Sequence, residues 1–249
     1  GRCEFCQHGD SALCARIQFL GEHRDGTFAQ WAQVPAAQVF PKPAHLNWTE
    51  AAALGVNHLT AWRMLFTKAR LQPWETVLIF GIGGGVSLAA LQLAKAIGAR
   101  TIVTSRDATK LQRAQAMGAD HAIHSTAEDV TKSVMACTDG RGVDVVFENV
   151  GAAVWPWAMK SLVRGGRLVT CGATTGDQPG ADLRRIFVRQ LQIFGSSLGS
   201  YGEFRDLLNM VTRTGLRPVI DREFPLEEVR SALDHLEPGA QFGKIALRI

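Results

Sequence analysis

A glycine-rich segment stands where an apolar run, residues 76–80, gives way to a helical pattern. A phosphate group needs backbone N–H donors at close range and the positive end of a helix dipole, and glycine lets the chain turn there with no Cβ in the way. Gly81 and Gly83 match the first two positions of the G-x-G-x-x-G dinucleotide fingerprint, whereas Val86 stands at the third and Ser87 is the next small residue. We predict that this turn binds a pyrophosphate. The expected contact residues are Gly81, Gly83, Gly84, Gly85 and Val86.

The end of the next expected strand, residues 101–104, carries the side chains that would meet the adenosine ribose. A carboxylate there binds the 2′-hydroxyl of NAD, whereas a hydroxyl and a guanidinium suit the 2′-phosphate of NADP. Ser105 and Arg106 follow this strand, Lys110 comes one turn later, and Asp107 is interpreted as a helix N-cap. The sequence favours NADP and leaves two alternatives open: NAD as the cofactor, and Arg106 as a solvated surface residue.

Three cysteines with the spacing Cys3-x2-Cys6-x7-Cys14 begin the chain. No signal-peptide pattern precedes them, which indicates a reducing compartment, where clustered cysteines favour metal over disulfides. A tetrahedral structural zinc takes four ligands. The fourth would be His8 or a cysteine upstream of Gly1, because the chain begins inside the motif and is interpreted as a fragment.

Alternating apolar runs and helical patterns must position these residues, and they predict an α/β fold, a Rossmann doubly wound parallel sheet. Residues 1–57 are irregular and suggest a small β-rich unit. Strands are expected at 76–80, 101–104, 121–123, 143–147, 167–171, 191–195 and 244–248. Helices are expected at 86–97, 108–117, 130–138, 153–163, 182–189, 204–214 and 227–236.

Composition narrows the possible partners. The 249 residues carry a net charge of +4 without a long Lys/Arg block, which argues against a nucleic-acid partner, while a mild positive charge suits an anionic cofactor. No apolar run reaches the ~18 residues of a membrane span. We expect a cytoplasmic protein with a small-molecule substrate.

With these motifs in place, the whole chain resembles the medium-chain dehydrogenase/reductase superfamily, in its zinc-containing alcohol-dehydrogenase-like branch. Cys3, Cys6 and Cys14 match the last three cysteines of that family's C-x2-C-x2-C-x7-C structural zinc lobe, and the Gly-rich turn matches as well. The other matching segments are Leu20–His23, Asp25–Ala29, Leu59–Trp62, Asn149–Gly151, Cys171–Gly176 and Phe242–Ile245.

The resemblance implies three parts and a set of site residues. Residues 1–57 would be the C-terminal part of a GroES-like β-rich catalytic domain with its structural zinc lobe, 58–199 a Rossmann NAD(P)-binding domain, and 200–249 the return to the catalytic domain. Val56 stands where the family places its third catalytic-zinc ligand, and valine cannot bind a metal. The resemblance also implies that Thr60, Asn149, Val150, Gly172, Ala173, Thr174, Ser196 and Ser197 lie against or near the ribose–nicotinamide half of the cofactor.

Two functions follow as hypotheses. The first is an NAD(P)-dependent oxidoreductase that transfers hydride between the nicotinamide and a small alcohol or carbonyl, or an activated alkene. It resembles either an alcohol dehydrogenase or a quinone/enoyl reductase. Thr60 and His58 are its weak catalytic candidates, and the resemblance implies a homo-oligomer, a dimer or tetramer. The second is a non-enzymatic dinucleotide-binding module or redox sensor.

Overall fold

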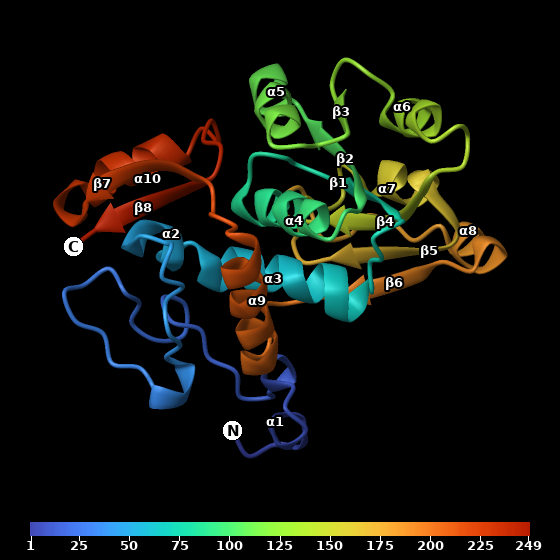
Figure 1. The fold of residues 1–249 in the computed structure, drawn as a ribbon. Helices are drawn as coiled ribbons and strands as arrows, with labels where there is room; N and C mark the ends of the chain where they lie inside the picture. Colours follow the sequence, from blue (N-terminus) through green and yellow to red (C-terminus); the bar gives the residue numbers. More distant parts are fainter. The chain divides into compact units, whose positions relative to one another are not determined.

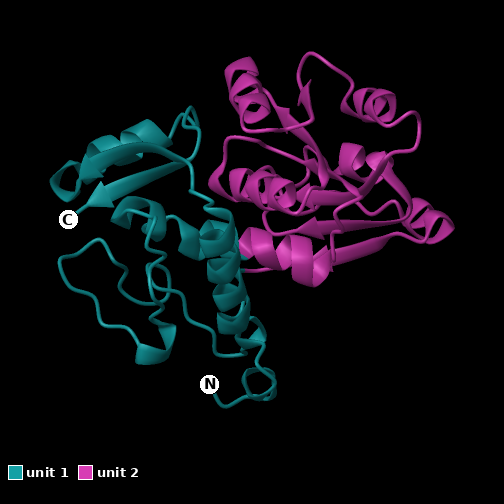
Figure 2. Ribbon diagram, viewed as in Figure 1, with its two compact units in different colours: residues 1–59, 198–249 teal, residues 60–197 magenta.

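The computed structural model describes residues 1–249, which form two compact units. Unit 1 comprises residues 1–59 and 198–249, and unit 2 comprises residues 60–197 (Figure 2). None of the helices is long and apolar enough to cross a lipid bilayer.

Unit 2 is built on a six-stranded parallel sheet with the strand order β3-β2-β1-β4-β5-β6 (Figure 1). This is the order of a doubly wound Rossmann sheet, and it confirms the predicted fold class. The strands are β1 Thr76–Ile79, β2 Arg100–Ser105, β3 His121–His124, β4 Val143–Glu148, β5 Leu162–Thr170 and β6 Gln192–Gly195.

The central strands read as continuous apolar runs because both of their faces are covered. Every residue of β1 and β4 is buried, and β1 pairs with β2 on one side and β4 on the other. Parallel strands of this kind need crossover connections, which the intervening helices supply. The helices of this region are α3 Leu59–Trp62, α4 Gly85–Ala96, α5 Ala108–Ala116, α6 Val130–Cys137, α7 Trp155–Ser161 and α8 Leu183–Arg189.

Helix ends follow ordinary capping chemistry. Asp107 begins α5 by accepting hydrogen bonds from the backbone N–H groups of Thr109 and Lys110, as the N-cap interpretation predicts. Gly98 and Gly118 follow α4 and α5 with φ values of +87° and +95°. These values suit glycine, which explains why the glycines mark the helix stops in the sequence.

Unit 1 contains one two-stranded parallel sheet, formed by β7 Ile220–Pro225 and β8 Lys244–Arg248. Strand β7 was not predicted from the sequence, because its polar residues hide its period. The other elements of unit 1 are α1 Glu4–Gln7, α2 Trp48–Ala52, α9 Tyr201–Thr214, α10 Val229–Leu236, 3₁₀ turns at Ser11–Leu13, Ala36–Gln38 and Leu226–Glu228, and a π-helical turn at Leu54–His58.

Residues 1–57, for which a β-rich unit is expected, contain no strand in this structure. That segment contains short helical turns and loops, and its sole β interaction is an isolated bridge between Leu20 and Arg24. A strand persists only where a neighbouring strand takes up its N–H and C=O groups. Extended segments of residues 1–57 pair with no such neighbour.

Candidate functional site

The turn at residues 81–85, called here the nucleotide turn, lies between β1 and α4 at the carboxyl end of the sheet. Gly81 and Gly83 have φ values of +66° and +112°, which side-chain-bearing residues rarely adopt. Helix α4 begins at Gly85, and no side chain caps its first turn. Its first N–H groups therefore lie at a positive dipole end with no capping acceptor, as an anion site requires.

A lysine from the next helix closes one side of the nucleotide turn. A Cβ built on Gly83 would lie 2.7 Å from Cδ of Lys110, so the glycine allows the lysine stem to cross the backbone there. On the other side, a Cβ on Gly81 would lie 3.2 Å from Cγ2 of Val150. Two of the predicted cofactor-binding side chains thus meet the predicted turn.

Ser87 follows Val86, which occupies the third glycine position of the fingerprint, and it links the turn to the end of β4. Its side chain is fully buried and donates a hydrogen bond to the Phe80 carbonyl at 2.8 Å. The amide Nδ2 of Asn149 donates to Ser87 Oγ at 3.0 Å. The Oδ1 atom of Asn149 is buried without a hydrogen-bond partner, which is costly for a buried polar atom.

The tip of β2 carries one carboxylate, which caps the next helix. Ser105 is the last residue of the strand, and its hydroxyl accepts from the backbone N–H of Asp107 at 3.1 Å. The Asp107 carboxylate accepts both capping hydrogen bonds of α5 through one oxygen, Oδ1. Arg106 between them is exposed. With Lys110 one turn later, two cations and one carboxylate lie near this tip.

Two loops meet at the ends of β4 and β5 and bring together the residues that the resemblance implies. The hydroxyl of Thr174 donates to the Val150 carbonyl at 3.1 Å. A Cβ on Gly172 would lie 2.9 Å from the Asn149 carbonyl oxygen, so this close approach requires glycine. Asn149, Val150, Gly172 and Thr174 thus form one contiguous surface.

A buried carboxylate holds these loops in place. Glu148 is 0% exposed, and its Oε1 accepts from the backbone N–H groups of Val150 at 2.5 Å and Gly151 at 2.6 Å. Its Oε2 accepts from the Thr170 hydroxyl at 2.7 Å. Sequence reasoning missed Glu148. The signal that could have identified it is an acidic residue at the end of an apolar strand that is buried on both faces.

A cavity of about 540 Å³ opens at the carboxyl ends of β4, β5 and β6. Gly172, Ala173 and Ser196 line it, and so does Cys171. Burial raises the pKa of the Cys171 thiol to about 12, so this cysteine is neutral at physiological pH. The Oγ of Ser196 is buried without a partner.

Three predicted site residues stand apart from this description. Thr60 and His58 are both buried in the helical stretch that includes α3, but His58 belongs to unit 1 and Thr60 to unit 2. Ser197 is exposed after β6.

The three N-terminal cysteines, called here the cysteine lobe, do come together. The sulfur atoms of Cys3, Cys6 and Cys14 all lie within 4.8 Å of one another, and those of Cys3 and Cys6 are 3.5 Å apart. A backbone hydrogen bond from Cys6 lowers the pKa of Cys3 to about 7. His8 is not part of this group, and its Nδ1 is hydrogen-bonded to the Glu4 carbonyl at 2.7 Å. Three thiols at these separations fit three corners of a tetrahedral zinc site.

Comparison with known proteins identifies the relatives of this fold. The sequence profile of the zinc-binding dehydrogenases matches residues 85–213. An NAD-dependent alcohol dehydrogenase of Saccharolobus solfataricus is 30% identical over 99% of this chain and 71% of its own length. These matches confirm the predicted resemblance and the predicted oxidoreductase class.

Solved structures agree. A crystal structure of an NAD-dependent alcohol dehydrogenase superimposes with a TM-score of 0.95 and 40% identity, covering 100% of this chain and 73% of that one. A 2-octenoyl-CoA carboxylase reductase in complex with NADP and 2-octenoyl-CoA superimposes with a TM-score of 0.90 and 28% identity, covering 97% and 59%. The relatives therefore include both alcohol dehydrogenases and enoyl reductases.

Proposed function

Because this chain belongs to the zinc-binding dehydrogenase family, we propose that it transfers hydride between NADP and a small alcohol, a carbonyl or an activated alkene. The observation that carries the proposal is the nucleotide turn. It combines left-handed glycines, an uncapped helix start and a lysine stem laid across Gly83. The bound nicotinamide supplies the hydride chemistry, and the protein orients it and excludes water.

The preference for NADP over NAD rests on the tip of β2. Asp107 caps helix α5, and its Oδ1 is directed at the backbone N–H groups of Thr109 and Lys110. Arg106 is exposed beside the hydroxyl of Ser105, and Lys110 reaches the turn from α5. A guanidinium and an ammonium favour a phosphate over a hydroxyl at this position.

Within this proposal the described residues divide the work of binding. The backbone N–H groups of the nucleotide turn, including that of Val86, hold the pyrophosphate. The buried free Oδ1 of Asn149 and Oγ of Ser196 are candidate acceptors for the ribose–nicotinamide half. The other residues assigned to that half are Thr60, Val150, Gly172, Ala173, Thr174 and Ser197.

For the metal, we propose that Cys3, Cys6 and Cys14 supply three thiolates to a structural zinc. The mutual approach of their sulfur atoms supports this assignment. Residues 1–57 and 200–249 would then belong to a GroES-like catalytic domain, and 58–199 to the Rossmann domain.

The substrate class follows from the position that the resemblance gives to a zinc ligand. Val56 stands there, with a side chain that cannot ligate, and it is 63% exposed in the π-helical turn Leu54–His58. We therefore favour reduction of an activated double bond or carbonyl, with Thr60 and His58 as candidates to hold or move a proton.

Cofactor titrations test the proposal. The full-length protein should bind NADPH more tightly than NADH, and Arg106→Ala should remove the difference. Lys132→Ala is a matched control, because it removes one exposed positive charge of unit 2 from helix α6. Equal affinities in the parent would contradict the NADP assignment. Tight binding without turnover of any alcohol, aldehyde, quinone or enone would favour a non-enzymatic binding module.

We also propose a homo-oligomer. Strand β6 is an edge of the sheet, and Ile193 on it is 38% exposed. On α8, Leu183 and Phe187 are each 68% exposed. An unpaired edge with apolar neighbours invites pairing with a second copy. A monomer by light scattering would contradict this assembly.

A further inference from the structure

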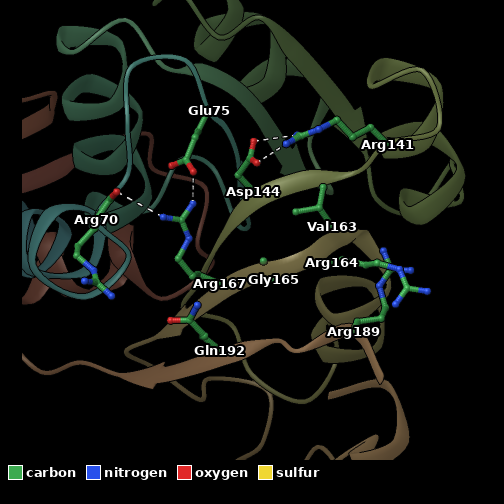
Figure 3. A pocket seen from close by; sticks show the side chains of 11 residues that line it. Arg70, Glu75, Arg141, Asp144, Val163, Arg164, Gly165, Arg167, Arg189 and Gln192 are labelled. Carbon is green, nitrogen blue, oxygen red and sulfur yellow. Dashed lines mark hydrogen bonds and ion pairs between the residues drawn. The ribbon is translucent and has the colours of Figure 1, made fainter. Parts of the chain in front are cut away.

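A second group of charged side chains lies at the other end of the unit 2 sheet, where the strands begin. A cavity of about 650 Å³ opens there beside the first residues of β4, β5 and β6 (Figure 3). Five arginines and two carboxylates line it. Cofactor sites in doubly wound sheets lie at the carboxyl ends of the strands, so this cavity is separate from the nucleotide turn.

Both carboxylates of this cavity are already paired. Asp144 receives two hydrogen bonds from Arg141, at 2.6 and 3.0 Å, and Glu75 is paired with Arg167 (Figure 3). The other three arginines of the lining have no carboxylate partner. They are Arg70, Arg164 and Arg189.

A smaller cavity of about 310 Å³ adjoins the first and shares Arg164 and Arg189 with it. It adds Arg184 and Arg185 from α8. Its single carboxylate, Asp182, caps α8 by accepting from the backbone N–H of Arg185 at 2.9 Å. Four guanidinium groups therefore face one carboxylate that is already hydrogen-bonded.

We call Arg164, Arg184, Arg185 and Arg189 the arginine cluster. Backbone carbonyls near the ends of α7 and α8 hold three of them, which fixes their guanidinium groups. Arg164, Arg185 and Arg189 donate to these carbonyls at distances of 2.7 to 3.0 Å. A carbonyl orients a guanidinium but does not neutralise it.

Two observations show that the positive charge of the cluster is unrelieved. The Nε atom of Arg189 is buried and has no hydrogen-bond partner, and such a donor is costly to leave unmet. Burial and the neighbouring charge of Arg189 lower the pKa of Arg185. An anion among these side chains would offset the repulsion between Arg185 and Arg189.

We propose that the arginine cluster is a binding site for a phosphate group, separate from the cofactor site. Planar guanidinium forks match phosphate oxygens two at a time, and these arginines are already oriented. The phosphate would lie between Arg164 and Arg189, which line both cavities. The larger cavity, which also exposes Gln192 and Gly165, leaves room for the organic part of a phosphate monoester (Figure 3).

Isothermal titration calorimetry of the full chain, with the cofactor site filled by saturating NADPH, tests this site with two probes, inorganic phosphate and glycerol 3-phosphate, at constant ionic strength. We expect one site with a dissociation constant of about 1 mM or lower, and a loss of about tenfold or more in affinity for Arg164→Gln/Arg189→Gln. Arg184→Gln, whose side chain makes no described hydrogen bond, should keep the fold and weaken binding a few-fold. It provides the test if the double variant fails to fold.

One control variant separates this site from the other cationic surfaces. Lys132→Gln removes an exposed charge elsewhere on unit 2 and should bind phosphate as the parent does. Tighter binding of glycerol 3-phosphate would assign a monoester, and preference for inorganic phosphate would assign the free ion. No binding of either probe by the parent, or unchanged binding in a folded Arg164→Gln/Arg189→Gln protein, would overturn the proposal.

Discussion

Replacement of Glu148 should lower the free energy of unfolding of the protein. This side chain is fully buried and receives three hydrogen bonds, two from the backbone N–H groups of Val150 and Gly151 and one from Thr170. Glu148→Ala leaves the buried N–H of Gly151 and the part-buried N–H of Val150 without their acceptor. At about 1–3 kcal/mol for each group, with a cavity added, we expect a loss of about 3–5 kcal/mol in the free energy of unfolding.

Two further variants should lose less free energy of unfolding than Glu148→Ala. In Glu148→Gln the amide oxygen can still accept from both N–H groups while the amide nitrogen turns toward Thr170, so the expected loss is about 1–2 kcal/mol. Thr170→Val removes a single hydrogen bond and should cost about 1 kcal/mol. Because the Asn149–Gly151 loop depends on Glu148, affinity for NADPH should fall in the same order as stability.

Urea unfolding at equal m-value measures the differences in stability, and fluorescence titration measures the affinity for NADPH. A Glu148→Ala protein within about 1 kcal/mol of the parent would refute the reasoning, because two N–H donors without their acceptor cannot cost so little. Unchanged affinity for NADPH in a destabilised Glu148→Ala protein would refute the link between this carboxylate and the loop.

Three other predictions concern glycine, cysteine and aspartate. Gly83→Ala should weaken NADPH binding about tenfold, since the new Cβ would meet the Lys110 stem; Gly98→Ala, with open space around it, should leave affinity unchanged in the same titration. Alkylation of Cys3, followed by mass spectrometry, should reach half its maximal rate near pH 7 and decrease below it, and zinc should protect the thiol. Although burial opposes ionisation, Arg141 holds the pKa of Asp144 below its usual value. Asp144→Asn should therefore cost about 1–2 kcal/mol at pH 7, and urea unfolding should show this difference shrinking as the pH falls below about 4 and vanishing once the pH has passed the lower pKa of the folded state. A constant difference between pH 7 and pH 3 would contradict that assignment.

The Rossmann unit could be predicted from the sequence because its signals are local. The run at 76–80 is apolar since β1 is covered on both faces, and Gly98 marks a helix end because the chain there has a positive φ. The departure from the G-x-G-x-x-G pattern also has a local cause, since the Ser87 hydroxyl donates a hydrogen bond to the Phe80 carbonyl. Each of these residue types is explained by contacts close to it in the sequence.

Features that depend on distant pairing could not be predicted in this way. Strand β7, Ile220–Pro225, exists because β8 lies beside it, and residues 1–57 remain without a ladder because no strand pairs with them. Glu148 acquires its role from loops at both β4 and β5. The arginine cluster combines Arg164 with residues 184–189, and nothing in either segment indicates the other.

Unit 1 is discontinuous along the chain, and this affects its synthesis. Its two segments are tied by the ion pair of Glu50 with Arg217 and by a hydrogen bond from Gln38 to Tyr201. The 138 residues from Thr60 to Ser197 lie between the segments. At ~5–20 residues per second, the ribosome takes about 7–28 s to synthesise them. During that interval residues 1–59 lack their partners Tyr201 and Arg217, which are not yet synthesised, while unit 2 can fold. Early termination after unit 2 would therefore leave a folded unit 2 joined to an unpaired first segment.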